Sequence, residues 1–190
     1  AMGAIPTAAV VAVSVAAETE IDWLISFVEG LQSACDSLAP GSSVVGGDLA
    51  TAENGFISVT AFGDMQGLSP VKRDGASEGD GVYVAGTLGK AAAGLALLHH
   101  PDEQFARSYD EFVNIQLRPN PPIELGAVAS KSNASAMMDI SDGLSSDAYR
   151  LAEASGVTID IDSSALLGFQ AVLEQAAQSI DADTLPWVLH

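Results

Sequence analysis

The stretch Ala136–Leu144, with the sequence AMMDISDGL, constrains this chain more than any other part of it. An apolar run changes abruptly into the polar segment Asp139–Gly143, and apolar residues at helical spacing begin at Leu144. This pattern predicts a buried strand, a polar turn and then a helix. Because ligands of α/β folds bind at the carboxyl ends of strands, facing helix N-termini, the turn is the first candidate site.

The turn offers hard oxygen ligands. Asp139 and Ser141 alternate, so an extended backbone would point both to one face, and Asp142 follows at the bend. Clustered carboxylates suit Mg²⁺, which usually binds together with phosphate groups. The alternative is that these residues only cap the following helix ahead of a glycine turn, which is the commoner use of such a segment taken alone.

Composition limits the function classes. The chain has 190 residues, of which 48% are hydrophobic and 17% charged, so it can form one large or two small domains with a sizeable core. Its net charge is −18 with seven basic residues in total, which argues against binding to nucleic acid. If the substrates are phosphates, so acidic a protein needs divalent cations to mediate the contact.

The single cysteine and the N-terminal stretch bear on localisation. Cys35 has no partner for an internal disulfide, which favours a reducing compartment, and we expect a cytoplasmic protein. The first residues are apolar and rich in alanine, but they lack a basic segment and are interrupted by Pro6. They therefore predict neither a signal peptide nor a membrane span.

The loop-rich segment 63–81 separates two predicted domains, 1–68 and 69–190. In the first domain we expect a strand at 8–16, a helix at 19–38 and a hairpin-like pair of strands within 43–62. In the second domain the patterns predict helices at 90–100, 101–117, 124–130, 144–154 and 166–177, and short strands at 82–85, 136–138, 157–161 and 186–189.

A glycine-containing turn and two aspartates are not expected to bind a ligand. The turn Gly86–Gly89 precedes a helix, as a phosphate-binding loop does, but Ala91 follows Lys90 where the Walker motif requires Ser or Thr. We therefore expect a tight turn there. Asp64 and Asp80 are expected to be solvated loop carboxylates.

Three glycine- and aspartate-containing segments together supply what phosphoryl transfer needs. Gly46-Gly47-Asp48 ends a predicted strand, Arg73–Asp80 lies at the domain boundary, and Asp139–Gly143 is the turn described above. Glycines let the backbone approach phosphate closely, carboxylates hold Mg²⁺, and arginine binds phosphate oxygens in a bidentate manner. These are the components of phosphoryl transfer without a Walker loop.

The same segments resemble one known family. Val44–Ala50 (VVGGDLA), Arg73–Leu95 and Met138–Asp147 look like thiamine-monophosphate kinase, of the superfamily of aminoimidazole ribonucleotide synthetase, selenophosphate synthetase and the hydrogenase-maturation dehydratase. The resemblance implies a two-domain, PurM-like architecture. An α+β N-terminal domain would pair with its copy in a homodimer, and an α/β C-terminal domain would follow.

The resemblance also implies an activity and roles for individual residues. The activity is ATP- and Mg²⁺-dependent phosphorylation of thiamine monophosphate to thiamine diphosphate. Carried over to this chain, Asp48, Asp139 and Asp142 would ligate Mg²⁺, while Gly47, Asp48, Arg73 and Ser141 would contact ATP.

The chain departs from the family pattern at both ends. The Gly-Asp-Asp-rich metal loop that precedes the matching region in the family, and the Gly-Gly-Glu-Asp loop that follows it, are absent from the sequence. We therefore expect an architecture truncated at both ends that is inactive as a kinase by itself. Two alternatives stay open: another ATP-cleaving enzyme of the superfamily, such as a selenophosphate synthetase, and a non-catalytic nucleotide-binding or dimerisation module.

Overall fold

The computed structural model of the protein describes residues 2–190, which divide into two compact units. The sheet unit comprises Met2–Pro70 and Ile123–Asn133. The helical unit comprises Val71–Pro122 and Ala134–His190. The chain thus leaves the sheet unit after Pro70, returns to it for a single helix, and leaves it again after Asn133 to end in the helical unit.

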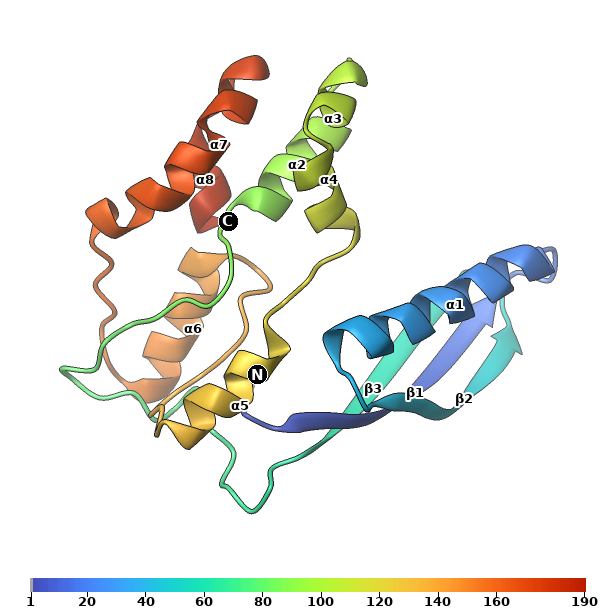
Figure 1. Ribbon diagram of the computed structural model, residues 1–190, viewed down its shortest axis with the longest axis horizontal. Helices are drawn as coiled ribbons and strands as arrows, with labels where there is room; N and C mark the ends of the chain where they lie inside the picture. The colour runs from blue at the N-terminus through green and yellow to red at the C-terminus, as the bar shows by residue number, and fades with distance from the viewer. Residues whose placement is uncertain (1) are drawn as a thin grey trace. The chain divides into compact units, whose positions relative to one another are not determined.

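The sheet unit contains a β-α-β arrangement with one added strand. Its elements are β1 (Ile5–Val15), α1 (Ile21–Leu38), β2 (Ser43–Thr51) and β3 (Phe56–Asp64). The sheet has the order β2-β1-β3, with β2 parallel and β3 antiparallel to β1. Because parallel neighbours need a long crossover, α1 carries the chain from β1 to β2 and lies along the sheet (Figure 1).

The hairpin-like pairing expected within 43–62 is wrong, because β1 lies between β2 and β3. The loop that joins β2 to β3 crosses the end of β1 instead. The Ala52 amide donates to the Val15 carbonyl at 2.9 Å, and the Ser14 hydroxyl donates to the Asn54 carbonyl at 3.3 Å. Asn54 and Gly55, between β2 and β3, thus lie in a connection that spans the end of the central strand.

Helix α5 (Ile123–Lys131) also belongs to the sheet unit, although it is far from the sheet in sequence. Gly3 adopts a φ of 90° and packs so closely on α5 that a Cβ there would lie 2.5 Å from the Ser130 Cβ. This close approach requires glycine and fastens the start of β1 to the helix.

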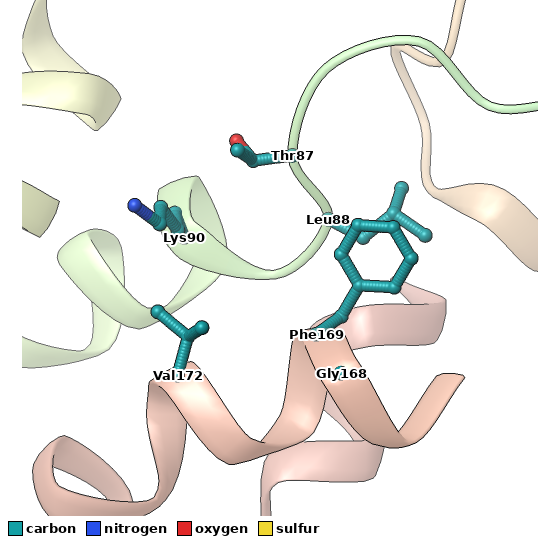
Figure 2. A pocket seen from close by; sticks show the side chains of 6 residues that line it. All are labelled: Thr87, Leu88, Lys90, Gly168, Phe169 and Val172. Atoms are coloured by element: carbon teal, nitrogen blue, oxygen red, sulfur yellow. The ribbon is translucent and has the colours of Figure 1, made fainter. Parts of the chain in front are cut away.

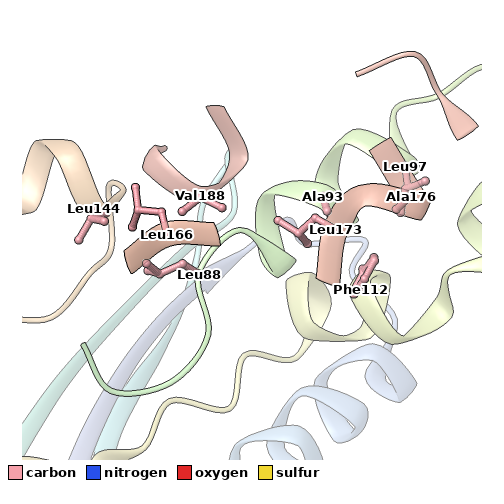
Figure 3. Close-up of a cluster of buried hydrophobic side chains, with 9 residues drawn as sticks. All are labelled: Leu88, Ala93, Leu97, Phe112, Leu144, Leu166, Leu173, Ala176 and Val188. Atoms are coloured by element: carbon pink, nitrogen blue, oxygen red, sulfur yellow. The ribbon is translucent and has the colours of Figure 1, made fainter. Parts of the chain in front are cut away.

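The helical unit holds the main core. Its helices are α2 (Lys90–Leu98), α3 (Gln104–Ser108), α4 (Asp110–Leu117), α6 (Leu144–Ser155), the 3₁₀ helix η1 (Ser163–Leu166), α7 (Leu167–Ser179) and α8 (Thr184–Leu189). The buried core contains side chains from most of these elements (Figure 3): Leu88, Ala93, Leu97, Phe112, Leu144, Leu166, Leu173, Ala176 and Val188. Helices α2 and α4 cross closely, since a Cβ on Gly94 would overlap the Phe112 carbonyl oxygen.

The short strands expected in this part of the chain are not confirmed. Segments 82–85, 136–138 and 157–161 form no strand in the region that the structure describes. An apolar or alternating segment becomes a strand only where a neighbour completes its hydrogen-bond ladder, and Tyr83 is instead 93% exposed. Segment 186–189 lies in α8, because the Leu185 amide donates to Asp183 at 3.0 Å as an N-cap bond and Pro186 falls in the first turn, where its missing N–H is not needed.

The single helix expected at 101–117 is divided into α3 and α4 at Tyr109, which has non-helical φ and ψ of −125° and 44°. The Tyr109 hydroxyl donates to the Gln175 carbonyl of α7 at 3.1 Å, so this residue also connects the α3–α4 segment to α7. Within residues 2–190, no helix has both the length and the apolar character needed to cross a bilayer.

Candidate functional site

The polar turn lies directly ahead of α6, as the sequence predicts. Gly143 is the N-cap of α6 with a φ of 102°, and Leu144 is buried behind it. A Cβ on Gly143 would also lie 2.6 Å from the His190 Cα. Both the dihedral angle and the close contact therefore require glycine, and together they fix where the turn ends and the helix begins.

A buried carboxylate holds this turn from the helix side. Asp147, on the first turn of α6, is only 1% exposed. Its Oδ2 accepts hydrogen bonds from the backbone amides of Ser141 and Asp142, both at 2.9 Å. Its Oδ1 accepts from Arg150 Nη1 at 2.8 Å. Burial by itself raises the pKa of Asp147, but the amides of Asp142 and Ser141 and the Arg150 guanidinium together lower this pKa below the ordinary value.

Arg150 connects the buried carboxylate to the exposed one. The same Nη1 atom that contacts Asp147 also forms an ion pair with Asp142 Oδ2. The hydrogen bonds to Asp142 and Asp147 raise the pKa of Arg150, which stays cationic. Asp142 remains 54% exposed, and its other oxygen, Oδ1, accepts a long hydrogen bond of 3.5 Å from the Ser141 hydroxyl.

A second segment lies beside the chain that leads into the turn. The Met137 amide donates to the Lys72 carbonyl at 3.0 Å, and Gly75 approaches the Ser135 carbonyl so closely that a Cβ there would overlap it. As the chain runs from Lys72 to Gly75, its neighbour therefore runs back from Met137 to Ser135. Arg73, which is exposed, is thus carried on a segment next to the approach to Asp139.

The C-terminal end of α6 fixes this second segment. The Ser155 hydroxyl donates to the Arg73 carbonyl at 2.8 Å and accepts from the Ala76 amide at 3.1 Å. Asp80 adds a further connection, because its Oδ2 accepts from the Ser135 hydroxyl at 2.6 Å and from the Ser77 amide at 2.9 Å. These two bonds lower the pKa of Asp80. Asp80 is exposed, as expected, but it also stabilises the loop.

Gly47 and Asp48 lie on β2, in the sheet unit. Gly47 pairs with Val11 of β1, and a Cβ on Gly47 would overlap the Val11 carbonyl oxygen, so the strand needs glycine there. Asp48 pairs with Ala12 and is exposed. Arg73, Asp139, Ser141 and Asp142 lie in the helical unit.

The donor chemistry of the turn fits a hard cation. Asp139 and Asp142 are exposed carboxylates separated by three positions, and Mg²⁺ in proteins commonly uses one or two carboxylates together with substrate phosphates and water. Among residues 2–190, no three His, Cys, Asp or Glu side chains form a group that could hold a metal.

An open pocket of about 390 Å³ lies elsewhere in the helical unit (Figure 2). Leu88 and the start of α2 line it on one side and α7 on the other, with mainly apolar side chains such as Phe169 and Val172. Lys90 at its edge forms an ion pair with Glu111 at 2.6 Å. The residues that line the pocket include none of those predicted for the site.

Comparison with known proteins identifies the family. Residues 1–65 match the N-terminal domain of AIR synthase related protein, and residues 77–185 match its C-terminal domain.

The chain belongs to the AIR synthase related protein family.

Curated members of this family resemble the chain over its whole length. It is 42% identical over 189 residues to thiamine-monophosphate kinase of Mycobacterium tuberculosis and 34% identical over 192 residues to that of Corynebacterium glutamicum. These alignments cover 100% of this chain but only 55% and 57% of the two relatives. The chain therefore spans about half the length of the curated relatives that it matches.

Solved structures of the family share the fold. Thiamine monophosphate kinase from Aquifex aeolicus superposes with a TM-score of 0.82 at 30% identity, covering 99% of this chain and 62% of that one. AaThiL complexed with AMPPCP and TMP gives a TM-score of 0.80 at 30% identity, covering 99% and 59%. The mixed α/β, two-domain architecture expected from the motifs is confirmed, as is the resemblance to this kinase family.

The sequence patterns did not identify Asp147, Arg150 and Ser155. A signal for the first two was present, because Asp147 and Arg150 are separated by three positions and so share a face of the predicted helix. The sequence gives no signal for Ser155, because its partners Arg73 and Ala76 precede it by 82 and 79 positions.

Proposed function

We propose that the protein, in its full natural length, transfers the γ-phosphoryl group of ATP to thiamine monophosphate and forms thiamine diphosphate. One observation carries the proposal: the 42% identity to a thiamine-monophosphate kinase spans every part of this chain, including all three glycine- and aspartate-containing segments. The exposed, firmly held Asp139–Gly143 turn supports it, since such a turn can present carboxylates to a metal–phosphate complex.

In this proposal Asp48, Asp139 and Asp142 hold Mg²⁺. The metal, when bound, would supply charge neutralisation for the triphosphate. Asp142 can offer Oδ1 while Arg150 retains Oδ2, so the ion pair and metal binding are compatible. Asp48 would contribute from β2 of the sheet unit.

ATP contacts are assigned to Gly47, Asp48, Arg73 and Ser141. Gly47 is exposed on β2 and carries no side chain that would keep a phosphate or ribose from its backbone. Arg73 is exposed and its backbone is fixed by Ser155, so its guanidinium can contact phosphate oxygens with little loss of backbone freedom. Ser141 has its amide held by Asp147, and its hydroxyl, which donates to Asp142 Oδ1 at 3.5 Å, would turn to the nucleotide.

The chemical step requires positioning more than proton transfer. A terminal oxygen of thiamine monophosphate attacks the γ-phosphorus in line, the bond from the γ-phosphorus to the bridging oxygen breaks, and ADP leaves. Because phosphate oxygens are largely ionised at neutral pH, no strong general base is needed. The residues of this chain therefore act by placing charges.

We further propose that the protein is a cytoplasmic homodimer with domains 1–68 and 69–190. The strands β2 and β3 support a dimer, since they expose large apolar side chains such as Val45, Leu49, Phe56 and Val59, which are 54–64% exposed. The lone Cys35 supports a reducing compartment. The net charge of −18 supports the absence of nucleic-acid partners.

The test measures thiamine diphosphate formed from ATP, MgCl₂ and thiamine monophosphate by the protein in its full natural length. We expect turnover that EDTA abolishes and that Asp142→Ala reduces by at least about a hundredfold. The control is Asp64→Ala, which removes an exposed carboxylate at the end of β3, a strand position where the sequence predicted a loop. Turnover of ATP with selenide but not with thiamine monophosphate would instead show a selenophosphate synthetase. Nucleotide binding without any turnover would show a non-catalytic module.

A further inference from the structure

The carboxylates of the proposed Asp139–Gly143 turn are exposed, but the group that holds the turn is buried. Asp147 is the one charged side chain among the largest fully buried residues of the described chain. The proposed function assigns to Asp147 itself no contact with substrate or metal. Its three hydrogen bonds instead go to two backbone amides and one guanidinium.

Each of these bonds fixes a different degree of freedom. The two amide bonds, at 2.9 Å each, hold the peptide groups of Ser141 and Asp142 and so set the path of the turn. The Arg150 bond, at 2.8 Å, orients a guanidinium that in turn holds the Asp142 carboxylate. Backbone and side chain of Asp142 therefore depend on the same buried carboxylate.

We propose that Asp147, acting with Arg150, is the positioning residue of the Asp139–Gly143 turn and sets how well Asp142 meets a Mg²⁺–nucleotide complex. This inference rests on the proposed function for the ligand, but the positioning itself can be measured without it. Partners that orient metal ligands from behind typically change metal affinity by about 10- to 100-fold when they are removed. Asp147 and Arg150 stand in this relation to Asp142.

Asp147→Asn is the sharpest variant, because it keeps the size of the side chain while it replaces one acceptor oxygen by an NH₂ donor and removes the negative charge. A single amide oxygen cannot serve both the turn amides and Arg150. We expect hydrogen exchange at the Ser141 and Asp142 amides, followed by NMR, to become at least about tenfold faster. We expect the Mg²⁺ concentration for half-maximal binding of AMPPCP, followed by calorimetry, to rise about 10- to 100-fold.

Leu173→Ala is the matched control. Leu173 is fully buried on α7, so its truncation lowers the melting temperature without touching the turn. A merely structural role for Asp147 predicts that both variants behave alike. The proposal predicts that only Asp147→Asn changes the two amide rates and the Mg²⁺ requirement.

Arg150→Gln is a second variant that tests the positioning role, and it does so even if Asp147→Asn does not fold. Arg150 is 44% exposed, so its replacement leaves the core intact. We expect its Mg²⁺ requirement for AMPPCP binding to change at least about threefold, since the Asp142 carboxylate loses its partner. An unchanged requirement in Arg150→Gln, or unchanged amide exchange in a folded Asp147→Asn, would overturn the proposal. If the unsubstituted protein binds no Mg²⁺–AMPPCP, the proposed function is wrong, and the amide exchange rates alone decide on the positioning role.

Discussion

At the scale of single residues, Gly143 is a position where both the backbone conformation and the packing require glycine. Its φ of 102° is unfavourable for any residue with a Cβ, and the added atom would lie 2.6 Å from the His190 Cα. We expect Gly143→Ala to lower the free energy of unfolding by about 1–3 kcal/mol, measured by urea denaturation.

Gly168 is the matched control, because it lies in α7 with no atom within 4 Å of a built Cβ. Gly168→Ala should raise the free energy of unfolding by up to about 1 kcal/mol, since alanine has the higher helix propensity. A Gly143→Ala protein as stable as Gly168→Ala would contradict the geometry of the turn.

Asp147 gives a pH dependence with a defined sign. Its pKa in the folded protein lies below the ordinary value of 3.8, so its ionised form stabilises the fold at pH values above 3.8. This contribution should be lost as the pH falls through the folded-state pKa, below 3.8. We expect Asp147→Asn to be less stable near pH 7, by about 1–3 kcal/mol for the groups left unpaired, and to lose less further stability on acidification.

The measurement compares urea unfolding of both proteins from pH 7 to pH 3. Parallel stability curves over this range would show that the Asp147 carboxylate contributes nothing specific. Asp142→Asn is the comparison variant, because it also removes a negative charge next to Arg150 but at an exposed side chain.

At the scale of elements, α6 joins the two segments of the candidate site that lie in the helical unit. Its first turn carries Asp147, which holds the Asp139–Gly143 turn, and its last residue, Ser155, holds Arg73 and Ala76. The helix ends at Gly156 with a φ of 67°, in the left-handed region that favours glycine. A single rigid helix therefore sets the separation of the carboxylate turn from the arginine segment.

Ser155→Ala tests this connection. The variant removes the hydroxyl that donates one hydrogen bond to the 73–76 segment and accepts another from it. We therefore expect its free energy of unfolding to fall by about 0.5–1.5 kcal/mol and the hydrogen of the Ala76 amide to exchange faster with solvent. Ser179→Ala at the end of α7 removes only a bond within its own helix, at 2.7 Å to the Ala176 carbonyl, and should leave the Ala76 amide unchanged. Equal exchange rates in the two variants would argue against the fixing role of Ser155.

At the scale of the whole molecule, the contrast between the two units supports self-association. The core cluster lies in the helical unit, whereas the described residues of β2 and β3 include no buried position. An apolar sheet surface of this kind is stabilised by covering it, and a second copy of the chain would do so. We expect light scattering to report twice the mass of the chain at micromolar concentration.

Two charge variants test which face of the sheet is involved. Val59 and Phe62 are three positions apart on β3, so they point to opposite faces, and both are at least half exposed. One of Val59→Asp and Phe62→Asp should be monomeric, while Ile21→Asp on the exposed side of α1 should not change the mass. If both strand variants keep the mass of a dimer, the sheet is not the interface.

Local pattern predicted most helices of this protein well. The expected helices at 19–38, 90–100 and 124–130 correspond to α1, α2 and α5 within a few residues, because apolar spacing and Gly or Pro stop signals act over short range. The three segments of the candidate site were also visible in the sequence, since glycines and acidic residues interrupt the apolar pattern there.

The secondary-structure predictions were wrong where the conformation of a segment depends on residues far away in the sequence. The expected strands at 82–85, 136–138 and 157–161 have no ladder among the described residues, and the expected helix at 101–117 is divided at Tyr109, whose hydroxyl bonds to α7. Strand formation and helix interruption at these positions are decided by neighbours that a window of ten residues does not contain.

The sequence by itself determined the position of the Asp139–Gly143 turn, the glycine ends of α6 and the chemistry that the turn presents, because each follows from residues adjacent in the chain. Only the tertiary structure decided that β1 lies between β2 and β3, that Asp147 is buried beneath the turn, and that Ser155 reaches Arg73. Backbone pairing and burial depend on which distant segments pack together, and the free energy of that packing belongs to the folded chain as a whole.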